Sequence, residues 1–170
     1  MTMHSASDTW REKDGVITLS VTSNGRTGEE WITYFESMDI QINTWVKDVL
    51  RSSAFQPTSG ITMNIAILKG ELFTDENRVT SFIRAEADKR RLTKPNAEIA
   101  CLICDLFTNQ EIEAMDLNWI VTMHDPINDS DRNPCLLSRS SGCDGPYLTA
   151  LCGGPDRGWG RDLGFAFAVS

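Results

Sequence analysis

The sequence predicts a single α+β domain with a mixed or antiparallel sheet. Apolar residues with helical spacing dominate the N-terminal two-thirds, where about five helices are expected between strands. After residue 125 the composition shifts to Asp, Asn, Gly, Ser and Pro, interrupted by short apolar runs, which is typical of a C-terminal run of short antiparallel strands. The order of elements lacks the regular alternation of strands and helices that a doubly wound fold shows.

The strand predictions rest on alternation and on apolar runs. Residues 16–21 alternate apolar and polar side chains, the pattern of a half-buried strand. Residues 61–68 are apolar on both faces, which predicts a strand in the middle of a covered sheet. Residues 117–124 alternate again, with odd-numbered side chains on one face and even-numbered side chains on the other. Shorter strands are expected at 135–137, 147–152 and 165–169.

Two capping boxes predict where helices begin, because their side chains satisfy backbone N–H groups that lack a partner in the first turn. They are Thr27 with Glu30 and Thr108 with Glu111. The remaining helices are expected over 41–51 with Trp45, Val49 and Leu50 inward, over 74–91 with Thr74 as its cap, and over 95–106 beginning at Pro95.

Size and charge restrict the class of protein. The chain has 170 residues, 41% of them hydrophobic, and a formal net charge of −8. That length suits one domain, and we expect residues 1–14 to form a flexible tail before a domain over 15–170. An acidic chain repels polyanions, so nucleic acids are not expected partners. A membrane partner is not expected either, since no apolar run approaches the roughly 20 residues of a membrane span.

The five cysteines indicate the cellular compartment of the protein and part of its buried core. An odd number of cysteines, without an export signal at the start of the sequence, indicates reduced thiols and therefore a cytoplasmic protein. Cys101 and Cys104 have the spacing of a redox or zinc pair, but both lie within a predicted helix, on a face of small residues. We expect them to be buried core residues rather than a reactive pair.

The segment after the third predicted strand carries an acidic bend. Asp129, Asp131 and Asn133 alternate like the first oxygen ligands of a calcium loop, which makes a divalent cation a possible cofactor. Pro134 and Ser140 stand where such a loop needs Gly and Glu, so an Asx-type turn is the favoured interpretation. In a plain turn, alanine at positions 129 and 131 should change stability by no more than about 0.5 kcal/mol.

His124 stands at the end of a predicted strand beside Asp125, a place where a general base or a metal ligand can lie. The only other histidine, His4, lies in the predicted tail. The alternative is a structural histidine that is hydrogen-bonded at the edge of the sheet, and this is the favoured interpretation.

An aromatic and basic set lies in the glycine-rich C-terminal part: Trp159, Tyr147, Arg157 and Arg161. A flat ring flanked by arginines is a surface that can bind a sugar, a peptide or a partner protein. A tryptophan that covers the edge of the sheet explains Trp159 equally well.

Four stretches resemble a group of short, uncharacterised bacterial proteins from environmental genomes. They are PNAEIACLI at 95–103, WIVTMHDP at 119–126, DSD at 129–131 and WGRDLGFAF at 159–167. The resemblance extends from about Thr27 to the C-terminus and implies a bacterial domain family, without an activity, a cofactor or a catalytic residue.

Two functions remain. The favoured one is a non-catalytic binding module, in which residues 125–134 and 153–162 form one solvent-facing site for an unknown protein or small molecule, and no resident cofactor is expected. The alternative is a metal-assisted hydrolase, in which His124, Asp125, Asp129 and Asp131 hold a divalent ion that activates water. Whether the protein is an enzyme and whether it forms homo-oligomers are left open.

Overall fold

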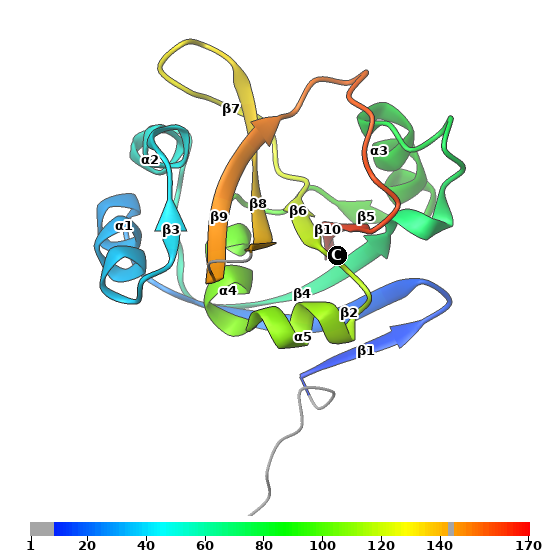
Figure 1. Ribbon diagram of the computed structural model, residues 1–170, viewed down its shortest axis with the longest axis horizontal. Helices are drawn as coiled ribbons and strands as arrows, with labels where there is room; N and C mark the ends of the chain where they lie inside the picture. Colours follow the sequence, from blue (N-terminus) through cyan, green and yellow to red (C-terminus); the bar gives the residue numbers. More distant parts are fainter. Residues whose placement is uncertain (1–8, 143–144) are drawn as a thin grey trace, which may run out of the picture.

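A computed structural model describes residues 9–142 and 145–170 and shows an α+β fold, as the sequence predicts (Figure 1). The helices are α1 Gly28–Ser37, α2 Thr44–Arg51, α3 Thr80–Lys89, α4 Glu98–Leu106 and α5 Asn109–Ala114, with a 3₁₀ turn, η2, at Gly70–Leu72. The strands are β1 Trp10–Lys13, β2 Val16–Asn24, β3 Gln41–Ile42, β4 Ser59–Lys69, β5 Leu92–Thr93, β6 Trp119–Thr122, β7 Ile127–Asn128, β8 Pro134–Gly142, β9 Gly145–Cys152 and β10 Leu163–Val169.

The described strands form one mixed sheet in the order β1-β2-β4-β10-β6-β8-β9-β3, with β5 beside β10 and β7 beside β8. β10, the last strand of the chain, lies in the middle, antiparallel to β4 and parallel to β6. Within β10, Phe165 pairs with Leu68 of β4 on one side and with Val121 of β6 on the other. β8 and β9 form the expected antiparallel hairpin.

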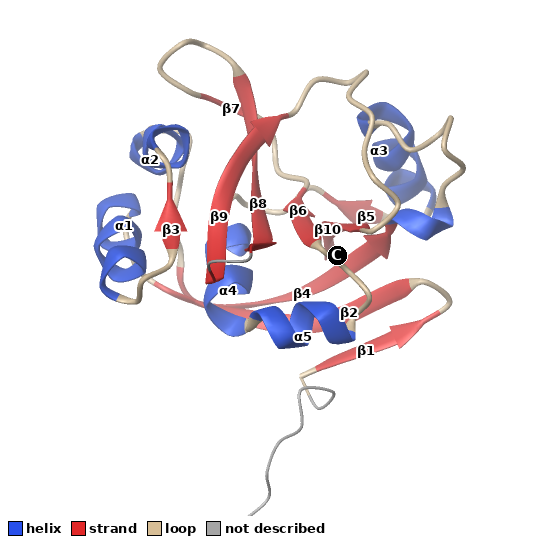
Figure 2. Ribbon diagram, viewed as in Figure 1, coloured by secondary structure: helices blue, strands red, loops and turns tan. Residues whose placement is uncertain are grey.

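Each face of the sheet packs against its own layer, because alternate residues of a strand point to opposite sides. Ile67 and Ile120 face the larger core, which α1, α2, α4 and α5 cover, whereas Leu68 and Val121 face a smaller core under α3 and Trp159 (Figure 2). The sheet is strongly bent: β8 and β9 run upright in Figure 1 and β2 and β4 run across it, with α4 packed against β2, β6, β8 and β9.

The cysteines of α4 lie in this larger core, as the small-residue face predicts. Cys101 is fully buried and Cys104 is 2% exposed. Burial raises the pKa of the Cys104 thiol to about 12 and also raises that of Cys101, so neither forms a thiolate readily. Cys101 and Cys104 are therefore packing residues of the larger core.

Three predicted helix features are wrong, each for a local reason. The helix expected from residue 74 begins at Thr80, because the buried Arg78 side chain donates to the carbonyls of Gly70 and Phe73 and keeps the preceding segment in turns. The segment at 41–42 forms β3, and α2 then begins at Thr44 with Trp45 half exposed, at 52%. The fourth helix begins at Glu98, so residues 95–97 form a separate connecting segment.

The expected tail also differs from the structure for residues 10–13, which form β1 against β2. Asp14 and Gly15 connect the two strands with positive φ angles of 53° and 78°, the conformation that an Asp-Gly hairpin turn requires. Residues 1–8 lie outside the described residues. Within the described part of the chain, no helix combines the length and the apolar character needed to cross a membrane.

The contact between α1 and α2 gives a stability prediction. A Cβ atom on Gly28 would lie 1.7 Å from the carbonyl oxygen of Leu50, whereas one on Gly158 would meet nothing within 4 Å. We expect Gly28→Ala to lower the free energy of unfolding by more than the roughly 1–3 kcal/mol of ordinary overpacking, because a backbone atom must move. Gly158→Ala should stay within about 0.5 kcal/mol of the wild type in the same urea titration. Equal stability of the two variants would contradict this packing.

Candidate binding pocket

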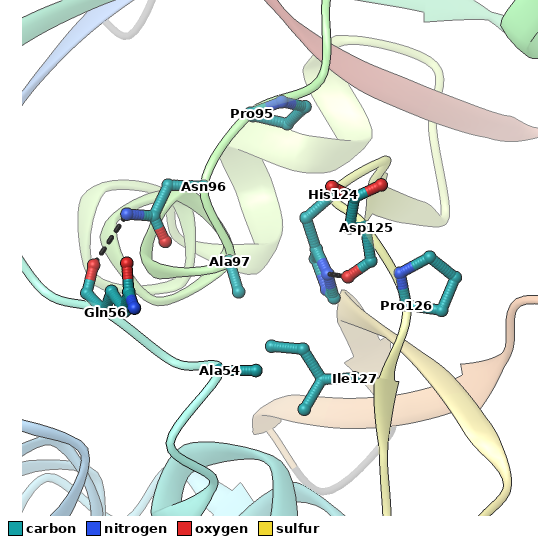
Figure 3. A pocket seen from close by; sticks show the side chains of 9 residues that line it. All are labelled: Ala54, Gln56, Pro95, Asn96, Ala97, His124, Asp125, Pro126 and Ile127. Carbon is teal, nitrogen blue, oxygen red and sulfur yellow. Dashed lines mark hydrogen bonds between the residues drawn. The ribbon is translucent and has the colours of Figure 1, made fainter.

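Three segments meet around a pocket of about 370 Å³ next to the C-terminal end of β6 (Figure 3). One segment follows α2, the second lies between β5 and α4, and the third runs from the end of β6 to Ile127, the first residue of β7. The pocket is lined by Ala54, Gln56, Pro95, Asn96, Ala97, His124, Asp125, Pro126 and Ile127. Its volume is within the range of small-ligand sites.

The wall formed by the first two segments is held by side-chain hydrogen bonds. The Asn96 Nδ2 atom donates to the carbonyl oxygen of Gln56 at 2.6 Å, and its Oδ1 atom accepts from the backbone N–H of Glu98 at 3.2 Å (Figure 3). The buried Glu98 carboxylate accepts from the backbone N–H of Thr58 at 2.8 Å and from the Thr58 hydroxyl. These bonds fasten the loop after α2 to the start of α4, so this wall is formed without a ligand.

Two basic side chains hold the third segment. Arg84 of α3 donates to the carbonyl oxygens of Met123 and His124 at 2.9 and 3.0 Å. Lys94 donates to the Asp125 carboxylate at 2.8 Å, and this hydrogen bond lowers the pKa of Asp125. Both Lys94 and Asp125 are exposed, so their ion pair stands at the mouth of the pocket and contributes little stability.

His124 is fixed through both ring nitrogens. Its Nε2 atom accepts from the backbone N–H of Leu137 at 3.0 Å, and its Nδ1 atom lies 2.6 Å from the carbonyl oxygen of Asp125. Because an N–H group can only donate, Nε2 carries no proton, and Nδ1 must therefore donate to Asp125. Burial lowers the pKa of His124 to about 4, so the ring is neutral at pH 7. This arrangement matches a structural histidine and leaves no nitrogen free for a metal or a substrate proton.

The acidic bend forms an Asx-type turn. The Asp129 carboxylate accepts from the backbone N–H groups of Asp131 and Asn133, both at 2.9 Å, from Asn133 Nδ2 at 3.3 Å and from the Cys135 thiol at 3.8 Å. Donation by Asn133 is the main cause of a lowered pKa of Asp129. Within the described residues, no three His, Cys, Asp or Glu side chains are grouped as a metal site requires. Asp129 is only 8% exposed and its carboxylate holds the turn together. We therefore no longer expect alanine at position 129 to leave the stability unchanged.

The C-terminal aromatic and basic set does not line the pocket. Trp159 is 7% exposed, its indole N–H donates to the Thr80 hydroxyl at 2.9 Å, and its ring packs edge-on against Phe165. The ring therefore covers the smaller core and is not available as a binding surface. Arg157 lies over its outer side, 4.6 Å from the ring centre. Tyr147 lies on β9 and Arg161 is exposed before β10.

The structure thus brings His124 and Asp125 of the predicted site together, and places the acidic bend and the Trp159 segment outside the pocket. Sequence reasoning missed Gln56 and Asn96. Both stand in loops rich in turn residues, but nothing in their local sequence shows that the two loops meet.

The chain matches no protein-family model, no curated protein and no solved structure. The resemblance to uncharacterised bacterial proteins therefore stays a prediction.

The buried, neutral His124 predicts a pH dependence of stability. In the unfolded chain a histidine takes up a proton near pH 6.5, whereas folded His124 does so only near pH 4. Stability should therefore fall as the pH falls from about 6.5 to 4, by up to about 3 kcal/mol. In His124→Gln, which keeps an acceptor for the Leu137 N–H but cannot titrate, urea titrations should show a smaller loss over the same window. An identical pH dependence of the two proteins would contradict a neutral, buried His124.

Proposed function

We propose that this protein is a non-catalytic binding module and that the pocket at 54–56, 95–97 and 124–127 is its recognition site. One observation carries the proposal: the pocket has the size of a ligand site, while the one histidine in its wall is neutral and has both nitrogens in use. The other ionisable side chain in the lining, the Asp125 carboxylate, is paired with Lys94. The wall therefore offers neither a free imidazole nor a thiol or hydroxyl nucleophile, and it can hold a molecule by shape and hydrogen bonds.

The lining indicates the class of ligand. Gln56 and Asn96 contribute amide side chains, Asp125 a carboxylate paired with Lys94, and His124 a neutral ring. The remaining lining residues are small or apolar: Ala54, Pro95, Ala97, Pro126 and Ile127. A small, neutral, polar molecule with both donors and acceptors, or a polar loop of a partner protein, fits such a wall better than a large apolar ligand. The favoured setting remains the cytoplasm, on the cysteine argument from the sequence.

The test is a ligand screen with a pocket-filling variant. Ala54 is exposed and lines the pocket, so Ala54→Trp should fill it without entering the core. Ala114 on α5 is also exposed and lies outside the pocket, so Ala114→Trp is the control. Small amides, amino acids and polyols are screened by ligand-observed NMR. Binding should disappear in Ala54→Trp and persist in Ala114→Trp. Equal binding by both variants would place the ligand elsewhere and contradict the proposal.

The metal-assisted hydrolase is tested separately by thermal melts with Ca²⁺, Mg²⁺, Mn²⁺ or Zn²⁺. An ion that binds only the folded protein raises the melting temperature. We expect no rise at millimolar concentration, because the Asp129 oxygens are occupied by the turn and His124 by Leu137 and Asp125. A rise that disappears in Asp131→Ala would instead support the hydrolase.

A further inference from the structure

Two cysteines lie directly opposite each other at one end of the β8–β9 hairpin. Cys135 and Cys152 are register partners, and in an antiparallel pair such residues point to the same face of the sheet. Cys135 is 5% exposed, whereas Cys152 is exposed, and both are free thiols. A reagent in solution therefore reaches Cys152 directly, whereas Cys135 is largely covered.

The hydrogen-bond pattern shows what kind of pair it is. Next to it, the backbone N–H of Gly153 donates to the carbonyl oxygen of Pro134 at 2.9 Å, which bonds β8 to β9 at that position. Two residues further along β8, the N–H of Leu137 points away from β9, to His124. Since bonded and non-bonded pairs alternate, Cys135 and Cys152 occupy a non-hydrogen-bonded position. Their Cα atoms are then about 4.5 Å apart, within the roughly 4.4–6.8 Å that a disulfide spans.

We propose that Cys152 and Cys135 form a thiol-modification site that reacts with low-molecular-weight disulfides and closes to an intrachain disulfide. The site is separate from the pocket and goes beyond the proposed binding function. By contrast, Cys101 and Cys104 are sealed in the core around α4 and give an oxidant no access.

The exposed cysteine reacts first. The Cys152 thiolate attacks one sulfur of the disulfide RSSR, the S–S bond breaks, and RS⁻ leaves and takes up a proton. Cys135 then gives up its proton to water and attacks the Cys152 sulfur, which releases the second RSH. Overall, two protein thiols and one RSSR become one protein disulfide and two RSH.

The surroundings of Cys135 fit this order. Burial, followed by the charge of Asp129, raises the pKa of the Cys135 thiol to about 11, which makes it a poor first nucleophile. Closure withdraws its sulfur from Asp129 and from the carbonyl oxygen of Asn133, the two acceptors it contacts in the reduced protein. Since Cys135 is also the register partner of the pocket residue Ile127, the disulfide would stiffen the strand next to the pocket.

The test is peptide mapping after incubation with oxidised glutathione and alkylation of the remaining thiols. Trypsin separates residues 133–139, which contain Cys135, from residues 140–157, which contain Cys143 and Cys152. Cys143 lies outside the described residues, so Cys143→Ser and Cys152→Ser are the matched pair of variants. We expect a linked peptide in the wild type and in Cys143→Ser, its absence in Cys152→Ser, and faster closure at pH 8.5 than at pH 7.

Three results would overturn the proposal. One is a linked peptide that persists in Cys152→Ser, because Cys143 would then be the partner. The second is a stable glutathione adduct on Cys152 without closure. The third is a wild-type protein in which Cys135 and Cys152 are both alkylated after the incubation. None of these results bears on ligand binding in the pocket, so the two proposals are tested independently.

Discussion

The sheet is continuous because its last strand, β10, is inserted between β4 and β6. Without it, the N-terminal strands β1, β2 and β4 would have no hydrogen-bonded connection to β6, β8 and β9. Phe165 and Phe167 fill the smaller core and Ala166 the larger one, so the same strand also joins the two layers. Two walls of the pocket follow strands that pair with β10, since residues 95–97 come after β5 and residues 124–127 come after β6.

Within that frame, His124 connects two parts of the C-terminal half. Its ring links the end of β6 to the middle of β8, while Arg84 of α3 holds the backbone carbonyl of the same residue. In this position the histidine fixes the arrangement of the two strands. Its ring accepts from one backbone group and donates to another, so neither nitrogen is free to bind a substrate. The other polar side chains that line the pocket are Gln56, Asn96 and Asp125, which is paired with Lys94.

Local signals in the sequence predicted local structure well. The capping box at Thr27 begins α1, Thr108 caps α5 by accepting from the backbone N–H of Glu111, and the alternation at 16–21 lies within β2. Local signals failed where contacts with residues outside the pattern determine the local structure. Hydrogen bonds of the Arg78 side chain keep α3 from beginning before Thr80. Trp159 is buried in the core under α3, although its glycine-rich surroundings suggested an exposed ring. The pocket had no signal of its own, because it arises where three loops far apart in the sequence meet.

The proposal of a non-catalytic pocket rests on the state of His124, a neutral ring with a hydrogen bond at each nitrogen. Nitrogen-15 NMR of the imidazole ring during a pH titration measures that state. We expect the tautomer with the proton on Nδ1, a protected Nδ1–H signal, and no protonation until the pH approaches 4. A ring protonated on Nε2, or one that titrates near 6.5, would contradict it.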